Sequence, residues 1–384
     1  MLGSKFPTQK AYGITTLYTL TSIIKKNESI RIFCLKSDYQ DTDFKEAVKY
    51  ITNFRLRTVP YLLINFAYKN TKTANKVFFR LGLFMMLIDN FRLITNFGPE
   101  IIWVRDPFIA FIARIISPNS RIILEVHSPD SMFFLKLLMK FSNHVNLFPI
   151  NNSNLMIIQK IKPEMKLSLA PMAIDIKNLP SQKEVTIFLN KLFSKQMHNL
   201  NIGYVGNVSP QGYSKGVEDL ISLAKFNQYL GNGNEVNLVG CTYEQIKYYS
   251  NLQLDLNIST TYLKFLPHVN HTAALKIMKN FDILVLPMPF DKSYNGMPLK
   301  LLEYLSSGRI TIMAESSLLK SIFGSGYKPY WYLSGDGNDL YEKIITAIQD
   351  KNLQDNIQQG LEFARQFSWE VRTSNILKSI NVEF

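Results

Sequence analysis

The sequence of 384 residues contains only two cysteines, and this scarcity excludes a disulfide framework. Cys34 and Cys241 lie in apolar runs that are typical of buried strands, and neither belongs to a CxxC pair of the kind that binds zinc. Glycine and proline are too few for a collagen-like or low-complexity chain. A hydrophobic content of 46% with 19% charged residues predicts a globular protein, and the low cysteine content fits a reducing compartment.

Long apolar runs are also missing. No segment approaches the roughly 20 consecutive apolar residues that a membrane-spanning helix needs. The run 81–88, for example, is bounded by Arg80 and Asp89. The first residues, MLGSKFPTQKAYG, have no apolar core of a secretory signal. We therefore expect a cytoplasmic protein, with peripheral attachment to the inner face of the cytoplasmic membrane as the alternative location.

The net charge of +13 is unevenly distributed along the chain. Residues 1–180 carry 24 basic and 12 acidic side chains, whereas residues 181–384 carry 19 and 18. A basic first half indicates an anionic partner, which could be a membrane surface, a nucleic acid or an anionic acceptor.

The stretch 45–80 concentrates this positive charge, because its only acidic residue is Glu46. Its basic residues, interleaved with Tyr, Phe and Leu, are Lys45, Lys49, Arg55, Arg57, Lys69, Lys72, Lys76 and Arg80. Two interpretations stay open. One is a solvated basic face of a helix, and the other is a docking surface for anionic lipid headgroups, worth about 1 kcal/mol per charge. Nucleic acid is less favoured, because no RNA-binding or zinc motif accompanies the charge.

Short apolar runs rich in β-branched residues alternate with segments of helical period along the whole chain. In the first half, the expected strands are 31–36, 101–105, 121–127, 146–150 and 166–170, and the expected helices include 14–25 and 107–116. In the second half, the expected strands are 201–208, 237–241, 262–266, 283–287 and 310–314. This alternation predicts parallel sheets that are covered by helices on both faces.

A chain of this length is expected to form two α/β domains, each a Rossmann-like, doubly wound parallel sheet, that face a cleft. The predicted domains are residues 1–175 and 201–365, joined by a linker at 176–200. Ser181 and Glu184 have the spacing of a capping box for a short helix in this linker. Ligands of such sheets bind outside the carboxyl ends of the strands.

A first candidate binding motif is IGYVGNVSPQGYSKGVEDL, residues 202–220. A strand is expected to end at Val205, a turn at Gly206 and Asn207 follows it, and a helix begins near Lys215. A glycine lets backbone N–H groups approach a phosphate, and a lysine supplies a positive charge. The alternative is an ordinary strand, turn and helix with a solvated lysine.

A second candidate motif, residues 282–316, runs from a buried strand through a loop into a helix that opens at Gly296-Met297-Pro298. Proline suits the first turn of a helix, whose free N–H groups and dipole attract an anion. Lys300 and Glu303 project from the first two turns, where a carboxylate could accept hydrogen bonds from a ribose. The alternative is a Lys–Glu pair worth a few tenths of a kcal/mol. Gly308 is expected to end this helix in a left-handed cap.

Together, YVGN…KG and PLKLLEYLSSG resemble the GT-B-fold retaining glycosyltransferases of family 4, the glycosyl transferases group 1, in their PLKLfEY variant. Four other segments resemble the family in the same order: FPTQKAYGITT, VRDPF…RIILEVHSPD, LAPMAID and FARQFSWEVR. The resemblance covers nearly the whole chain and implies that residues 366–384 form a helix that crosses back to the first domain. It implies transfer of a sugar from a nucleotide-sugar donor to an acceptor hydroxyl with retention, in cell-surface polysaccharide or glycolipid biosynthesis.

The resemblance also implies the site residues. Lys215 matches the basic residue on the donor diphosphate, Glu303 matches the second Glu of the family's E-x7-E element, and His127 matches a histidine near the transferred sugar. These three are the candidate catalytic residues. Asn207 stands where many members have an arginine, and Asn295 stands where the first Glu is expected. The other residues expected at the donor are Gly3, Gly206, His268, Gly296, Met297, Pro298 and Lys300.

The implied mechanism needs neither a metal ion nor another cofactor, because fixed cationic groups and backbone N–H groups stabilise the leaving nucleoside diphosphate. The implied partners are the donor and a glycan or lipid-linked acceptor. The sequence Asp41-Thr42-Asp43 spells the DxD of metal-dependent transferases, but no second acidic cluster supports it. Two alternatives to transfer stay open: a sugar-nucleotide epimerase of the same fold, and a non-catalytic sugar-nucleotide-binding protein.

Overall fold

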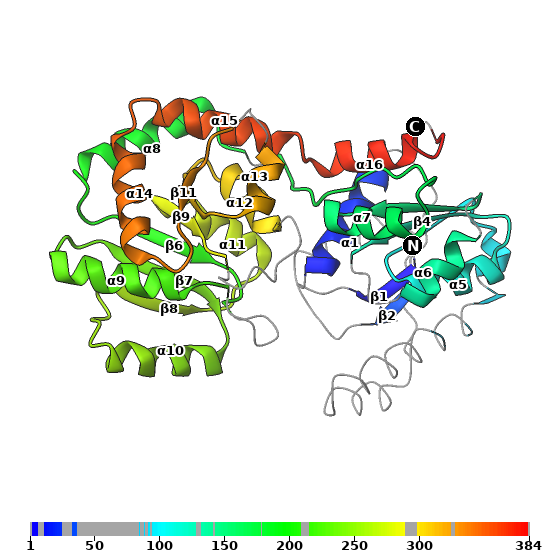
Figure 1. Ribbon diagram of the computed structural model, residues 1–384, viewed down its shortest axis with the longest axis horizontal. Helices are drawn as coiled ribbons and strands as arrows, with labels where there is room; N and C mark the ends of the chain where they lie inside the picture. Colours follow the sequence, from blue (N-terminus) through cyan, green and yellow to red (C-terminus); the bar gives the residue numbers. More distant parts are fainter. Residues whose placement is uncertain are drawn as a thin grey trace. The chain divides into compact units, whose positions relative to one another are not determined.

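The computed structural model describes residues 2–6, 11–24, 33–36, 84, 88, 91–92, 94–127, 132–140, 143–177, 179–208, 215–288, 298–323 and 327–382. The chain divides into two compact units (Figure 1). The first unit is Met1–Met172 with Trp369–Phe384, and the second is Ala173–Ser368. None of the helices in the described part of the chain has the length and apolarity that a membrane crossing requires.

The first unit contains two sets of parallel strands. Strand β1 (Leu2–Phe6) pairs with β2 (Phe33–Lys36), and a three-stranded sheet has the order β3 (Ile101–Val104), β4 (Arg121–Val126), β5 (Val145–Pro149). Four predicted strands are confirmed, with small shifts at their ends. The fifth, at 166–170, was wrong. Its alternation of leucine with polar residues imitates a half-buried strand, but the segment has no strand structure and Leu169 is exposed.

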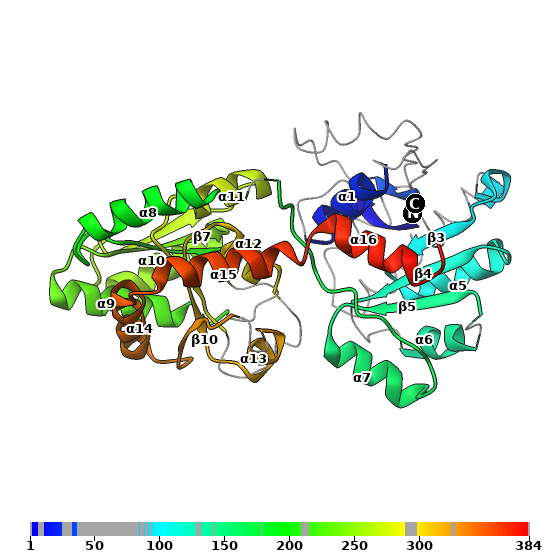
Figure 2. The ribbon, with the colours of Figure 1, turned by 90° about the horizontal axis from the view of Figure 1, so that it is seen from above.

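Helices of the first unit are α1 (Ala11–Ile24), α5 (Pro107–Ile116), α6 (Met132–Met139), α7 (Asn152–Ile161) and α16 (Trp369–Lys378). Helix α5 begins where proline predicted it, and the Asp106 side chain caps its first N–H groups. Helices α1 and α16 lie side by side (Figure 2). The rings of Tyr18 and Trp369 stack, and the hydroxyls of Ser22 and Thr373 are 2.7 Å apart. The carboxyl-terminal helix therefore packs in the core of the first unit.

The second unit is a six-stranded parallel sheet. Its order is β11 (Tyr330–Tyr332), β10 (Ile310–Ala314), β9 (Ile283–Leu286), β6 (Asn201–Val205), β7 (Glu235–Cys241), β8 (Leu263–Pro267). The order reverses between β6 and β9, which both lie in the middle of the sheet. Sheets of this topology bind ligands in the crevice outside the carboxyl ends of the strands at such a reversal. The two candidate motifs follow β6 and β9, so the topology brings them to the same point.

Helices cover both faces of this sheet, which explains why all four residues of β9 are buried without alternation. Helix α9 (Glu218–Leu230) packs against α14 (Gly337–Gln349) on one face. On the other face lie α11 (His271–Met278) and α12 (Leu299–Ser306), and α15 (Leu353–Arg365) covers α12. The remaining helices are α8 (Gln182–Ser194), α10 (Tyr243–Asp255) and α13 (Ser317–Phe323).

Residues 176–200, expected as a linker, belong to the second unit. The capping box of Ser181 and Glu184 is present at the start of α8. Helix α8 then places Val185, Leu189 and Leu192 in the core of this unit. The segment therefore contributes apolar packing to the second unit.

Candidate functional site

The turn after β6 and the first turn of α12 are in contact. A Cβ atom added to Gly206 would overlap the Cε atom of Lys300, so the lysine side chain lies directly on this glycine. The same glycine touches the end of the neighbouring strand, because a Cβ at Gly240 would lie 2.5 Å from the carbonyl oxygen of Gly206. At Gly240 the obstacle is backbone, so only a residue without a side chain fits there.

The segments that follow β6 and β9 also meet. Gly216, with φ of +77°, lies against the backbone of Met288, and an added Cβ would be 2.6 Å from the Met288 carbonyl oxygen. That carbonyl accepts a hydrogen bond from the Ser334 hydroxyl at 2.7 Å. The two motifs identified from the sequence therefore converge at the reversal of strand order. We call the group Gly206, Lys215, His271, Lys300 and Glu303 the switch-point site.

Glu303 is the most buried charged member of the switch-point site, with 4% of its surface exposed. Its Oε1 atom is 2.8 Å from Nε2 of His271, and its Oε2 atom is 3.7 Å from Nζ of Lys300. These two partners are partly exposed, so Glu303 lies beneath them. A ligand would meet the lysine and the histidine first.

Burial raises the pKa of the Glu303 carboxyl, but the charge of Lys300 and the bond to His271 outweigh it and hold the pKa below its usual range. Glu303 is therefore ionised at neutral pH and acts only as a hydrogen-bond acceptor. This carboxylate lies one helical turn after Lys300, so it could orient the ammonium group of Lys300 or accept a hydrogen bond from a sugar hydroxyl.

Two buried contacts hold this arrangement in place. The Tyr304 hydroxyl accepts from the N–H of Val205 at 2.8 Å and donates to the Val205 carbonyl at 3.3 Å, which ties α12 to the last residue of β6. The carboxylate of Asp219 accepts from the Tyr332 hydroxyl at 2.8 Å and from the N–H of Gly335. It thereby fixes α9 to the chain that leaves β11.

Lys215 and Asn207 lie where the sequence motif predicted, around the turn after β6. Lys215 is half-buried, and this burial lowers the pKa of its ammonium group. Its backbone N–H donates to the carbonyl of Val208 at 3.1 Å. The side-chain oxygen of Asn207 accepts from Gln245 of α10 at 3.3 Å, so this amide is already engaged within the unit.

Helix α12 begins one residue later than expected. Pro298 occupies the cap position before the helix instead of its first turn, and no side chain caps the helix there. The first N–H groups of α12 are thus of the kind that bind anions. Gly308 follows the helix with φ of +69°, as the left-handed cap requires. Asn295, Gly296 and Met297 lie outside the described residues, as do Asp41-Thr42-Asp43 and the basic stretch 45–80.

Two expected donor residues have other surroundings. Gly3 lies inside β1 and pairs with Cys34 of β2, so it is part of a strand and not of a loop. Too little sequence precedes it for the strand to be recognised from its pattern. His268 is exposed in the turn between β8 and α11, and its N–H donates to the carbonyl of Cys241 at 3.1 Å.

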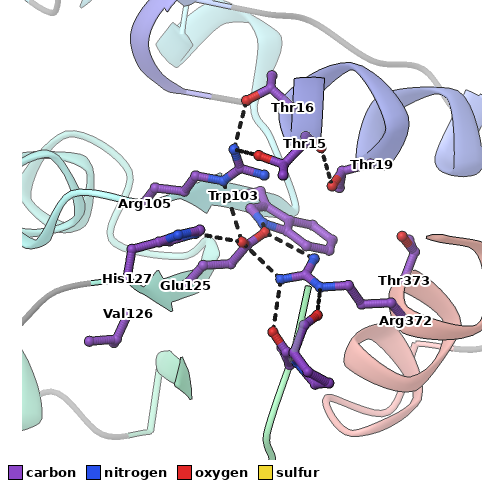
Figure 3. A network of polar contacts seen from close by, with 12 residues as sticks. Thr15, Thr16, Thr19, Trp103, Arg105, Glu125, Val126, His127, Arg372 and Thr373 are labelled. Atoms are coloured by element: carbon purple, nitrogen blue, oxygen red, sulfur yellow. Dashed lines mark hydrogen bonds and ion pairs between the residues drawn. The ribbon is translucent and has the colours of Figure 1, made fainter. Parts of the chain in front are cut away.

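His127 belongs to the first unit, at the end of β4, and lies in a buried polar cluster around Glu125 (Figure 3). Oε2 of Glu125 is 3.0 Å from Nε2 of His127 and 2.9 Å from a guanidinium nitrogen of Arg372. Nε of Arg105 lies 3.3 Å from the same oxygen. The indole N–H of Trp103 donates to Oε1 at 2.6 Å. One carboxylate thus gathers side chains from β3, β4 and α16.

Burial raises the pKa of the Glu125 carboxyl, but the guanidiniums of Arg105 and Arg372 outweigh it and hold the pKa well below its usual range. The pKa of His127 is also lowered, by burial and by the charges of the two arginines, although the bond to Glu125 opposes this. Glu125 is therefore ionised and His127 is neutral at neutral pH.

Among the described residues, no three or more His, Cys, Asp or Glu side chains gather closely enough to hold a metal ion.

Residues 177–361, nearly all of the second unit, match the family glycosyl transferases group 1. The match lies within the second unit and covers a little under half of the chain. The resemblance to glycosyl transferases group 1 that the two motifs indicated is thereby confirmed. The glycosyltransferase unit contains every described member of the switch-point site. No curated protein matches the sequence.

Solved structures resemble the chain over almost its full length. HepE from Anabaena, in complex with UDP-glucose, has a TM-score of 0.66 at 14% identity, covering 99% of both chains. Sucrose-phosphate synthase from Thermosynechococcus elongatus has a TM-score of 0.69 at 13% identity, covering 99% of this chain and 98% of that one. A UDP-forming trehalose-phosphate synthase from Burkholderia vietnamiensis has 0.64 at 11%, covering 99% of both. At these identities the likeness concerns the fold, and it confirms two parallel-sheet, GT-B-type domains.

Sequence reasoning missed three members of these arrangements. His271 follows the capping residue Asn270 at the start of α11, and its pattern indicated only a turn. Glu125 could have been noticed as a charge within an otherwise apolar strand, RIILEV. Arg372 lies in a segment that the resemblance already included, but its partner Glu125 is 247 residues away.

Proposed function

We propose that the chain is a retaining glycosyltransferase that moves a sugar from a nucleotide-sugar donor to an acceptor hydroxyl. The observation that carries this proposal is the convergence of Gly206, Lys300 and Glu303 at the strand reversal of a glycosyl transferases group 1 unit. HepE, which shares the fold, has been solved with UDP-glucose. A nucleotide-sugar is therefore the ligand class we assign to the switch-point site.

Lys215, Lys300 and the opening N–H groups of α12 are assigned to the donor diphosphate. Each hydrogen bond to a charged group contributes about 1.5–3 kcal/mol, so several directed at the leaving group would lower the barrier substantially. Glu303 is assigned to ribose hydroxyls, either directly or by orienting Lys300. The fixed cations supply the charge that a metal ion would otherwise provide, and we propose that transfer continues in the presence of a chelator.

The first unit is assigned to the acceptor, with His127 near the transferred sugar. A glycan or lipid-linked acceptor of cell-surface polysaccharide or glycolipid biosynthesis accounts for the basic first half of the chain. Peripheral attachment to the inner face of the cytoplasmic membrane would bring the enzyme to such an acceptor.

The direct test is release of nucleoside diphosphate from a panel of nucleotide-sugars. At least one donor should release its diphosphate, and Lys215→Ala and Glu303→Gln should each slow the release about tenfold or more. Lys225→Ala and Glu362→Gln are matched controls, because both side chains lie on exposed helix positions of the same unit. Full rates in both site variants would exclude the assignment.

Product analysis separates the alternatives. An epimerase would convert the donor without an acceptor, and a binding protein would retain the donor without turnover on any acceptor. The anomeric configuration of the product, determined by NMR, tests retention.

A further inference from the structure

The cluster around Glu125 determines the state of His127, through burial and through a shortage of negative charge. Among the described residues, the charged groups that face this histidine are Glu125 on β4, Arg105 after β3 and Arg372 on α16. One negative charge, that of Glu125, thus already faces the two positive charges of Arg105 and Arg372. A third cation beside them would be repelled by both arginines, which favours the neutral imidazole.

An ionised carboxylate accepts hydrogen bonds and cannot donate one. Nε2 of His127 lies 3.0 Å from Oε2 of Glu125, so the single proton of the neutral ring must be on Nε2. This places an unprotonated, accepting nitrogen at Nδ1. None of the described residues hydrogen-bonds Nδ1, and 30% of the side chain is exposed.

The other contacts of Glu125 prevent it from turning away. The indole N–H of Trp103 holds Oε1 at 2.6 Å. Arg372 reaches both oxygens, and it also donates from Nε to the carbonyl of Pro171 at 2.7 Å and from a terminal nitrogen to that of Ala170 at 3.2 Å. Trp103 from β3 and Arg372 from α16 therefore hold the carboxylate that His127 faces (Figure 3).

We propose that Glu125 and Arg372 are positioning residues, which hold His127 as the neutral tautomer protonated on Nε2 so that Nδ1 accepts a hydrogen bond from a sugar hydroxyl. The tautomer follows from the cluster alone, whereas the sugar hydroxyl as its partner rests on the proposed function. His127 would thus act as an acceptor and not as a cationic donor towards substrate.

The tautomer is measured on the full chain, labelled with 15N-histidine, by long-range 1H–15N NMR. The chain has five histidines, and the signal missing from His127→Gln assigns His127. At neutral pH we expect a protonated Nε2 and a bare Nδ1. A proton on Nδ1, or an imidazolium ion at neutral pH, would overturn the proposal without any assay of activity.

Two variants test the positioning residues separately. In Glu125→Gln, the carboxylate charge that raises the pKa of His127 is lost, so this pKa should fall further in an NMR titration. In Arg372→Met, loss of one positive charge should raise the pKa of His127 in the same NMR titration. An unmoved pKa of His127 in a folded Glu125→Gln protein, or in Arg372→Met, would contradict the assigned roles.

Trp103→Phe is the matched control, because it removes the donor to Oε1 and leaves the contact between Oε2 and His127. Its His127 tautomer should equal that of the unaltered chain. It also keeps the test decisive if Glu125→Gln fails to fold, since a changed tautomer here would show that Oε2 alone does not fix the ring.

A final arm connects the tautomer to substrate. The rate of nucleoside diphosphate release should fall on acidification in step with the NMR titration of His127. A rate that stays level while His127 becomes protonated would overturn the substrate role but leave the tautomer assignment intact. Absence of transfer with any donor would instead reject the proposed function.

Discussion

Gly206 is the residue at which a single added methyl group should disturb the switch-point site most. The side chain of Lys300 occupies the space that a Cβ would take. Because the atoms that this Cβ would meet are the far end of a flexible side chain, the lysine can move aside at little cost in stability. We expect Gly206→Ala to displace Lys300 and to weaken donor binding by about tenfold or more, as measured by calorimetric titration.

Gly231→Ala is the control for this prediction. Gly231 also has a positive φ, of +62°, but an added Cβ meets nothing within 4 Å. It should cost about 1–2 kcal/mol of folding stability through backbone strain alone and leave donor affinity unchanged. Equal affinities in both alanine variants would show that Lys300 does not bind the donor.

Glu303 should make the stability of the folded chain depend on pH. Its pKa in the folded chain is below its ordinary value, so the ion pair of its carboxylate with Lys300 and the hydrogen bond with His271 favour the folded state. This contribution to stability is fully present above the pKa that Glu303 has in the unfolded chain. It is lost as the pH falls through the lowered pKa that Glu303 has in the folded chain. Thermal melts of Glu303→Gln should therefore show a smaller loss of stability on acidification than those of the unaltered chain. An identical loss would contradict the lowered pKa.

Tyr304 connects helix α12 to strand β6. Its buried hydroxyl bonds both backbone groups of Val205, the last residue of β6. Tyr304→Phe leaves those groups without this partner, at a cost of about 1–3 kcal/mol. We expect a lower urea midpoint together with weaker donor binding, because α12 carries Lys300 and β6 carries Gly206.

Tyr330→Phe offers the comparison, since the Tyr330 hydroxyl is bonded to Asp350 away from the switch-point site. It should lower stability without weakening donor binding. Tyr304→Phe with undiminished donor affinity would show that the contact between α12 and β6 does not shape the site.

Most elements could be predicted from the sequence because each carries a strong local signal. Helix α5 begins at its proline, α8 begins at its capping box, and the apolar run of β9 marks a central strand. The strand predicted at 166–170 failed because alternating leucines occur in irregular chain as well. Strand β11 has only three residues and no comparable pattern.

The contacts between elements could not be predicted in the same way. The two motifs indicate a shared site, but the contact of Lys300 with Gly206 and the pairing of Glu303 with His271 depend on how α11 and α12 pack beside the sheet. The Glu125–Arg372 pair likewise joins residues that are far apart in the chain, and no local sequence pattern predicts such a pair.

At the scale of the whole molecule, the uneven distribution of charge predicts that the basic first half binds an anionic surface. If the basic first half docks on anionic lipid, the chain should sediment with phosphatidylserine vesicles and lose this binding as salt rises, because about 0.1 M salt screens charges beyond roughly 10 Å. The pair Arg55→Glu and Arg57→Glu should weaken the binding. The pair Lys225→Glu and Lys351→Glu in the second half should not. Equal loss in both pairs would contradict a specific basic surface.

The binding of a nucleoside diphosphate at the strand reversal is best tested by hydrogen–deuterium exchange of the full chain with UDP, ADP and GDP in turn. With the diphosphate that binds, exchange should slow in residues 202–208, 215–221 and 298–306 and stay unchanged in α14 and α15. Protection confined to other segments, or none with a diphosphate that demonstrably binds, would contradict the account.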